Sequence, residues 1–125
     1  KAPVELEEIE SEPEIEIYFG DIYGTRSGDK GGCANLGVWS KDQKSYSFLC
    51  NYLTVAKLKE LLPDLKRYKI ERYELANINS LNFYIHDILQ DGVSSNNRKD
   101  GQAKSLGEYL RAKKIKVPAS ITGEI

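Results

Sequence analysis

The order in which strand-like and helical patterns follow one another constrains the fold of this chain more than any other feature. Period-two alternation with β-branched or aromatic residues indicates strands, whereas apolar residues three or four apart indicate helices. The predicted elements are a strand at 15–23, a strand at 34–40, helical segments at 45–53 and 54–65, strands at 68–75 and 81–89, a helix at 103–114 and a strand at 115–117.

After the first strand, the predicted order is β-α-β-β-α-β, which is typical of a ferredoxin-like antiparallel sheet with two helices on one face. We therefore expect an α+β fold of this type with an extra N-terminal strand. Thr54 is expected to cap the helix that follows it, and Pro63 disfavours continuation of that helix. The glycine-rich segment between the first two strands is expected to join them as a wide hairpin.

Charge is distributed unevenly along the chain. Residues 1–16 contain seven glutamates and one lysine, whereas the rest of the chain contains 17 basic and 12 acidic side chains. We expect residues 1–14 to be an acidic flexible linker or tail, and residues 15–125 to form the ferredoxin-like domain. The mildly basic domain suits an anionic small molecule, but its charge is too weak to indicate nucleic acid.

Residue counts disfavour several classes of site and location. Cys33 and Cys50 form no CxxC pair, and the chain has only one histidine, so we expect no metal site and no other cofactor. Two reduced thiols indicate a cytoplasmic protein. No apolar run approaches the roughly 18 residues that span a bilayer, and the start lacks signal-peptide features, so no membrane partner is expected. Because the sequence contains no methionine, we expect it to be a fragment or a processed chain.

The stretch TRSGDKGGCAN, at 25–35, is the first candidate site. Its glycines permit positive φ angles, and successive N–H groups in such a loop can form an anion nest. Lys30 could add a point charge and Arg26 a bidentate donor, whereas Asp29 could pair with them, form an Asx-turn or act as an acid or base. The spacing matches neither a Walker A loop nor a dinucleotide-binding motif. The residues alone leave a ligand loop and a structural turn open.

A second group of polar residues lies in the C-terminal half of the chain. Its members are Asn77, Asn79, Asn82, His86, Ser94, Ser95, Asn96, Asn97, Arg98 and Asp100. Asparagine-rich loops usually make turns, but their amides can also donate to a carbonyl or hydroxyl ligand. A single histidine without an evident partner is more often packed or exposed than catalytic, and without a GxSxG motif a hydrolytic triad is not supported.

Three stretches resemble motifs of a known family. RSGDKGGCANLGV is similar to the RSGDKG-x-x-A-N-[IL]-G-V signature of the small C-terminal domain in the acyclic terpene utilisation (AtuA-like) proteins. ERYELANINSLNF resembles that family's E-R-Y-E-L-P-N-L-x-A-L-N-F segment, and DGVSSNNRKDGQAKSLGEYL resembles G-G-V-S-x-S-x-R-x-D-x-Q-G-K-S-L. The three stretches cover most of residues 26–118 in the family's order. The departures are Ala76 in place of Pro, and Asp91 and Ala103 in place of Gly.

The resemblance implies a ferredoxin-like domain that is fused behind a larger domain or acts as its separate small partner. It also selects the site residues, since the polar matches cluster in two loops. The residues expected to act in catalysis are Asp29 and Lys30. Those expected to bind a ligand are Arg26, Ser27, Gly28, Gly31, Asn35, Asn82, Ser94, Arg98, Asp100 and Lys104.

Two functions follow as hypotheses. The first is an accessory domain or small subunit of a cytosolic catabolic enzyme, not catalytic alone, whose Gly28–Gly32 loop helps bind a carboxylate or acyl-CoA substrate. The second is a structural or oligomerisation module without a ligand of its own. The expected partners are the larger AtuA-type domain, upstream or separate, and further copies of the chain in a homo-oligomer.

Overall fold

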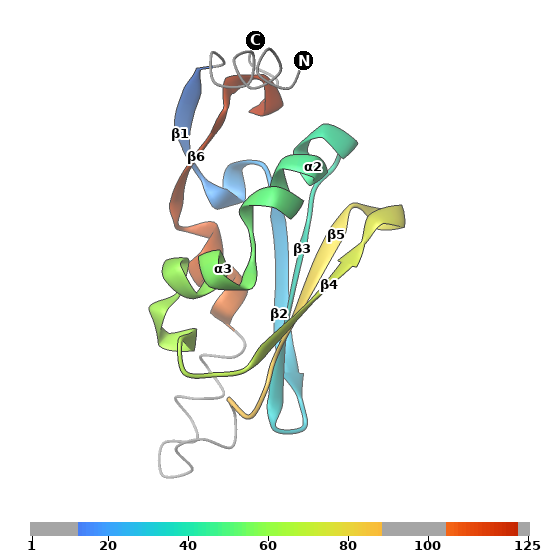
Figure 1. The fold of residues 1–125 in the computed structure, drawn as a ribbon, viewed down its shortest axis with the longest axis vertical. Helices are drawn as coiled ribbons and strands as arrows, with labels where there is room; N and C mark the ends of the chain where they lie inside the picture. The colour runs from blue at the N-terminus through green and yellow to red at the C-terminus, as the bar shows by residue number, and fades with distance from the viewer. Residues whose placement is uncertain (1–12, 89–104, 123–125) are drawn as a thin grey trace, which may run out of the picture.

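The computed structural model describes residues 13–88 and 105–122 of the chain. Its labelled elements are β1 (Glu14–Tyr18), β2 (Gly24–Lys30), β3 (Cys33–Trp39), α2 (Gln43–Tyr52), α3 (Val55–Leu61), β4 (Ile70–Leu75), β5 (Ser80–Ile85) and β6 (Lys114–Pro118). Residues 105–111 are also helical. Strands β2-β3-β5-β4 form one antiparallel sheet in that order, and β1 pairs antiparallel with β6 in a second sheet (Figure 1).

This arrangement confirms the predicted α+β, ferredoxin-like fold. The helices lie on one side of the four-stranded sheet (Figure 1). The last strand, β6, is present as predicted, but it pairs with β1, while β2 lies beside β3 at the edge of the larger sheet. The extra N-terminal strand therefore has a defined partner.

Alternation buries one face of the larger sheet against the helices. In β3 and β5 every second residue is buried: Ala34, Leu36, Val38, Leu81, Phe83 and Ile85. The helices and β6 contribute further members of the same cluster: Leu49, Leu58, Leu106, Leu110, Ile115 and Val117. Burial of these apolar side chains holds the helices and the second sheet against the first.

The predicted strand at 15–23 is shorter than expected. β1 ends at Tyr18, because Phe19–Asp21 forms a 3-10 turn. In this turn, the Asp21 carboxylate accepts a hydrogen bond from the Tyr18 N–H at 2.9 Å. Aromatic residues favoured a longer strand because they are common in strands. Here Phe19 lies in the turn instead, and its side chain is buried in the core.

The glycine-rich segment forms the predicted hairpin, but most of it is a strand, so the prediction that the hairpin is wide was wrong. Residues 24–30 form β2 although glycine and charged residues are uncommon in strands. The register pairs Lys30 with Cys33 and leaves only Gly31 and Gly32 in the turn. Gly31 has a φ angle of 63°, which a tight hairpin of the primed type requires at its first central residue.

Side-chain caps define the helix starts. The Thr54 hydroxyl accepts a hydrogen bond from the Lys57 N–H at 3.0 Å, which confirms Thr54 as the cap of α3. Asp42 caps α2 in the same way by accepting from the Ser45 N–H at 2.8 Å, and this bond lowers the pKa of Asp42. α3 stops before Pro63, as predicted.

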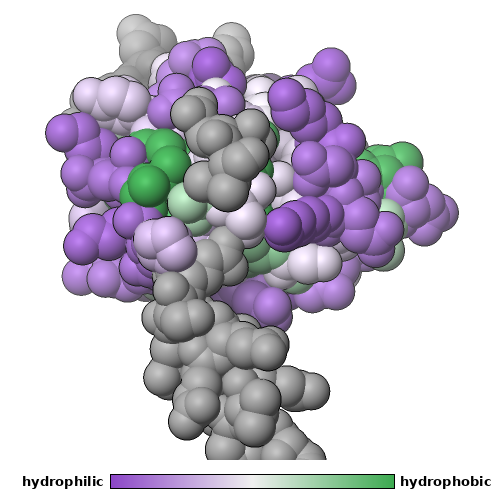
Figure 2. Space-filling view, turned by 90° about the horizontal axis from the view of Figure 1, so that it is seen from above, coloured by the Kyte–Doolittle hydropathy of each residue, from purple (hydrophilic) through white to green (hydrophobic). Residues whose placement is uncertain are grey.

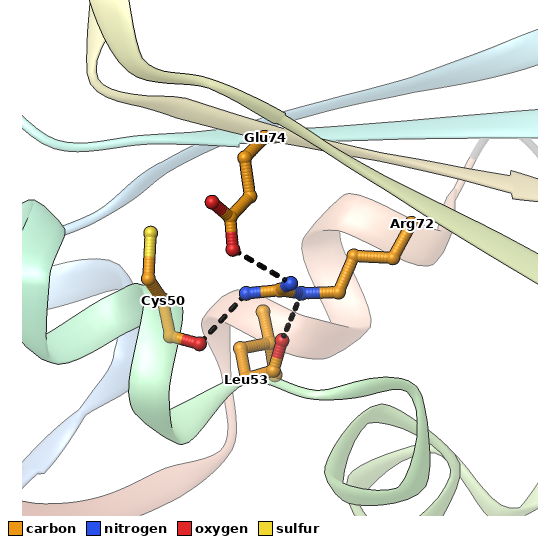
Figure 3. A network of polar contacts seen from close by, with 4 residues as sticks. All are labelled: Cys50, Leu53, Arg72 and Glu74. Atoms are coloured by element: carbon orange, nitrogen blue, oxygen red, sulfur yellow. Dashed lines mark hydrogen bonds and ion pairs between the residues drawn. The ribbon is translucent and has the colours of Figure 1, made fainter.

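Arg72 joins β4 to the end of α2 (Figure 3). Its Nε donates to the Leu53 carbonyl at 3.0 Å, its Nη2 donates to the Cys50 carbonyl at 2.7 Å, and its Nη1 pairs with Glu74 at 3.0 Å. Carbonyls in the last turn of a helix lack intrahelical partners, so this guanidinium satisfies groups that would otherwise need water.

The remaining predicted elements are present with shorter bounds. The strands expected at 68–75 and 81–89 are β4 and β5, and the helix expected at 103–114 is helical over 105–111. Asn79 joins β4 to β5 in the left-handed region, with φ of 52°. Among the described residues, no helix is both long enough and apolar enough to cross a membrane.

Candidate functional site

The face of the four-stranded sheet that points away from the helices is called the open face here. In the described part of the chain, no helix lies over it (Figure 1). Strand alternation and register place on it Gly24, Arg26, Gly28, Cys33, Asn35, Gly37, Trp39, Glu71, Tyr73, Leu75, Ser80, Asn82 and Tyr84. His86, just after β5, continues the row, since its ring contacts Tyr84.

The centre of the open face brings together two predicted ligand-binding residues that are distant in sequence. Asn35 Nδ2 donates to Asn82 Oδ1 at 2.8 Å. The register pairs Arg26 with Gly37 and Gly37 with Asn82, so the exposed Arg26 lies on the same row across the sheet. A Cβ added at Gly28 would meet nothing within 4 Å, and one at Gly37 would make only contacts of 3.8 Å. The centre of the face is therefore bare backbone beside two amides and a guanidinium.

Ser27 and Asp29 alternate to the other side of β2, toward the helices. Ser27 Oγ accepts a hydrogen bond from the Gly107 N–H at 3.0 Å. A Cβ at Gly107 would lie 2.7 Å from Thr25 Oγ1, so the helix at 105–111 packs closely against β2. The structure thus separates these two predicted residues from Arg26, and it gives Ser27 a partner within the protein.

The turn of the hairpin holds two more predicted residues. Lys30 ends β2 and Gly31 begins the turn. Because residues 24–30 are extended, their amides do not have the alternating right- and left-handed backbone of an anion nest. The predicted residues Ser94, Arg98, Asp100 and Lys104 lie outside the described residues.

A group of polar side chains, of which only His86 was a candidate from the sequence, lies near the hairpin end of the open face. Glu71 Oε2 is 3.4 Å from His86 Nε2, and the other carboxylate oxygen of Glu71 accepts a hydrogen bond from the Tyr73 hydroxyl. The ring of Tyr84 meets that of His86 edge to face, with centroids 5.1 Å apart. Cys33 lies on the strand next to Tyr84.

The electrostatics of this group follow its contacts. The hydrogen bond from Tyr73, followed in importance by the charge and proximity of His86, lowers the pKa of Glu71. The same bond raises the pKa of Tyr73, and a hydrogen bond with Cys33 raises the pKa of Tyr84. Alternation within the ERYEL motif, which puts Glu71 and Tyr73 on one face, was the signal that could have found this group.

The opposite end of the open face is apolar and exposed. Trp39 and Leu75 are each 43% exposed, and Ile78 in the following turn is 64% exposed. The ring of Trp39 covers Gly24, where an added Cβ would come within 2.3 Å of it. Viewed from the top of Figure 1, the described surface is mainly hydrophilic with small hydrophobic patches (Figure 2). Exposed aromatic residues of this kind favour a contact surface.

A pocket of about 350 Å³ lies on the helix side, away from the open face. Its lining residues are Leu62, Pro63, Asp64, Leu65, Leu106, Tyr109, Ala112 and Lys113. None of the described site residues lines it. Within residues 13–88 and 105–122, no three His, Cys, Asp or Glu side chains are grouped so that they could hold a metal ion.

Comparison with models of protein families shows which family the chain belongs to. The model of the AtuA ferredoxin-like domain matches residues 17–116. The chain belongs to the AtuA ferredoxin-like domain family. The comparisons found no matching curated protein and no matching solved structure.

In this AtuA ferredoxin-like domain, two of the family motifs build the four-stranded sheet. RSGDKGGCANLGV forms most of the β2–β3 hairpin, and ERYELANINSLNF forms most of β4 and β5. The register brings the two hairpins together through β3 and β5. The two motifs therefore supply most of the open face between them.

Proposed function

We propose that this domain is an accessory domain or small subunit of a larger cytoplasmic AtuA-type enzyme, and that it helps bind a carboxylate or acyl-CoA ligand. The observation that carries the proposal is the convergence of Arg26, Asn35 and Asn82 around bare backbone at Gly28 and Gly37. In this proposal, the larger domain covers the open face and supplies the rest of the active site.

The three polar side chains suit an anionic ligand. A guanidinium can bind a carboxylate or phosphate through two parallel hydrogen bonds. The bond from Asn35 to Asn82 uses the Asn82 oxygen, so the Asn82 amide nitrogen can donate to a ligand oxygen. Lys30, the last residue of β2, stays a proposed catalytic residue, whereas Asp29 lies on the other side of β2 and is not part of the open-face site.

Calorimetric titration with octanoyl-CoA and octanoate tests the anion site. We expect Arg26→Ala to raise the Kd by at least about tenfold, because it removes a charge-assisted pair. Lys116→Ala is the matched control, since it removes the same charge from the exposed side of β6. The proposal fails if Arg26→Ala, measured together with the larger domain, binds both ligands as tightly as the parent.

Alanine at Gly28 or Gly37 tests whether a ligand approaches the bare backbone. Neither added methyl group meets a neighbour closer than 3.8 Å, and neither position has a positive φ angle. We expect both variants to fold with unchanged or slightly higher stability and to bind octanoyl-CoA more weakly. Unfolding midpoints and Kd values measured on the same samples separate the two effects.

The apolar end of the open face supports the second candidate function, a structural or oligomerisation module. Trp39, Leu75 and Ile78 expose large apolar surface. If this function is correct, size-exclusion chromatography with light scattering should show a homo-oligomer or a complex with the larger domain, and Leu75→Ser should weaken it. A monomer that does not associate with the larger domain rules it out.

A further inference from the structure

Gly37 leaves a gap in the layer of side chains on the open face. Along β3, its neighbours on this face are Asn35 and Trp39. Across the sheet, its register partners are Arg26 on β2 and Asn82 on β5. Within 4 Å, a Cβ built at Gly37 would meet only the Arg26 carbonyl oxygen and Asn82 Oδ1, each at 3.8 Å. Four side chains therefore surround a space that a ligand can enter without displacing any of them.

The gap suits a flat ring that lies on the backbone. Gly28, which is paired with Asn35, extends the bare surface, since a Cβ there would meet nothing within 4 Å. Trp39 borders the gap on the other side, and its indole is 43% exposed where it rests over Gly24. Aromatic side chains of this kind commonly pack against the rings of nucleobases.

The two asparagines present an ordered hydrogen-bonding edge beside the gap. Asn35 Nδ2 donates to Asn82 Oδ1 at 2.8 Å, so the pair has Asn35 Oδ1 as a further acceptor and Asn82 Nδ2 as a further donor. Adenine matches such an edge, because its N6 amino group donates and its N7 accepts, and asparagine reads adenine through these two atoms. A carboxylate has acceptors only, so it cannot use Asn35 Oδ1.

We propose that the centre of the open face binds an adenine nucleotide. The purine ring lies on the Gly37 backbone, and its edge bonds to Asn35 Oδ1 and Asn82 Nδ2. Arg26 binds the phosphate through two parallel hydrogen bonds. The inference rests on the proposed anion site at Arg26, and it adds a base that a simple carboxylate lacks. It is a binding site only and involves no covalent step.

Adenosine monophosphate (AMP) and adenosine are the probes, and the readout is the NMR shift of the asparagine side-chain amides in the intact chain. Asn82→Asp is the sharpest variant, because it keeps the oxygen that accepts from Asn35 and replaces only the nitrogen that donates to the base. We expect it to raise the Kd of both probes at least about tenfold. Adenosine is uncharged, so its weaker binding cannot come from repulsion by the new carboxylate.

Three comparisons complete the design. Asn51→Asp adds the same charge on the exposed side of α2 and should leave both Kd values unchanged. Arg26→Ala should weaken AMP but not adenosine, because adenosine has no phosphate. Inosine monophosphate should bind the parent more weakly than AMP, since its ring has an oxygen where Asn35 Oδ1 needs a donor. This last comparison uses the parent, so it decides the question even if a variant does not fold.

The inference is overturned if millimolar AMP leaves the amide signals of Asn35 and Asn82 unshifted in the folded parent. Equal binding of AMP and inosine monophosphate also overturns it, as does an Asn82→Asp variant that is folded by circular dichroism and binds AMP like the parent. The proposed function can fail separately. If octanoate binds in an Arg26-dependent manner and AMP does not bind, the anion site stands and the nucleotide site does not.

Discussion

Arg26 and Arg72 show how the face of a sheet decides what one residue type does. Arg72 points toward the helices and satisfies the Cys50 and Leu53 carbonyls at the end of α2. Arg26 lies on the open face, exposed beside bare backbone. Both arginines lie in family motifs, but only Arg72 makes hydrogen bonds to backbone groups on the helix side of the sheet. Its role is structural, whereas Arg26 is available to a ligand.

Replacement of Arg72 by alanine should destabilise the domain. The variant loses two hydrogen bonds from a charged donor, so we expect the free energy of unfolding to fall by about 2 kcal/mol. Arg26→Ala removes an exposed guanidinium from the same sheet and should change this energy by no more than about 0.5 kcal/mol. Urea unfolding of both variants and the parent makes the comparison. If both variants lost a similar amount of unfolding free energy, the structural role assigned to Arg72 alone would be contradicted.

Tyr23 predicts how stability changes at alkaline pH. Its buried hydroxyl donates to the Ser45 carbonyl at 2.8 Å, and burial raises its pKa well above the ordinary value of 10.0. The unfolded chain ionises this tyrosine above about pH 10 while the folded chain does not, so stability is lost as pH rises beyond that value. The loss is about 1.4 kcal/mol per pH unit. Burial likewise raises the pKa of Tyr46, to about 12.

Tyr23→Phe should flatten this alkaline decline. Between pH 10 and 11, we expect the unfolding free energy of the variant to fall less than that of the parent by about 1 kcal/mol. Urea unfolding at pH 8, 10 and 11 measures the difference. Identical slopes in parent and variant would show that Tyr23 ionises normally in the folded state.

The candidate site could be predicted from sequence only in part. Motif matching selected Asn35 and Asn82, which the structure joins by a hydrogen bond. It could not assign residues to faces, because that depends on the register of β2 with β3. For this reason Ser27, grouped with Arg26 by sequence, points to the helix at 105–111 instead. Alternation in ERYEL places Glu71 and Tyr73 on one face, but the approach of Glu71 to His86 depends on the register of β4 with β5.

At the scale of elements, the β2–β3 hairpin carries the most distinctive sequence and the least expected structure. Propensity disfavours a strand made of Gly24–Lys30, yet every residue of it has a register partner on β3. Pairing with a buried central strand outweighs the weak local preference. The turn needs one glycine for its backbone angle, at Gly31, whereas Gly28 lies in ordinary extended backbone.

Alanine substitutions at these two glycines should therefore have opposite effects. Gly31→Ala places a Cβ at a φ angle of 63° and should cost about 1 kcal/mol of unfolding free energy. Gly28→Ala should be neutral or stabilise by up to about 1 kcal/mol, since it reduces the freedom of the unfolded chain. Thermal and urea unfolding test this, and Gly31→Asn should recover part of the loss because asparagine tolerates this region.

At the scale of the whole molecule, the fold consists of two sheets that share one core. The order of elements predicted the α+β class, because strand and helix patterns are local. It could not predict that β6 pairs with β1, since that choice depends on residues at opposite ends of the described chain. A two-stranded sheet is marginal in isolation, so β1 and β6 depend on Ile15, Ile17, Ile115 and Val117 packing against the larger unit.

Hydrogen exchange should therefore show that the two sheets differ in local stability. We expect backbone amides of β1 and β6 to exchange through a partial opening, with lower protection than those of β3 and β5. The central strands β3 and β5 are paired on both sides and should open only on global unfolding. Native-state exchange followed by NMR measures both groups in one sample. Equal protection across the two sheets would show that they unfold as one unit.

The position of Trp39 has a practical consequence for every binding question raised above. It is the only tryptophan of the chain, and its ring rests over Gly24 on the open face with 43% of its surface exposed. The emission of an indole changes in wavelength and intensity when water around it is replaced. A partner that covers this end of the sheet must therefore alter the intrinsic fluorescence of the unlabelled protein. The domain carries its own optical probe at the surface where its partner is proposed to bind.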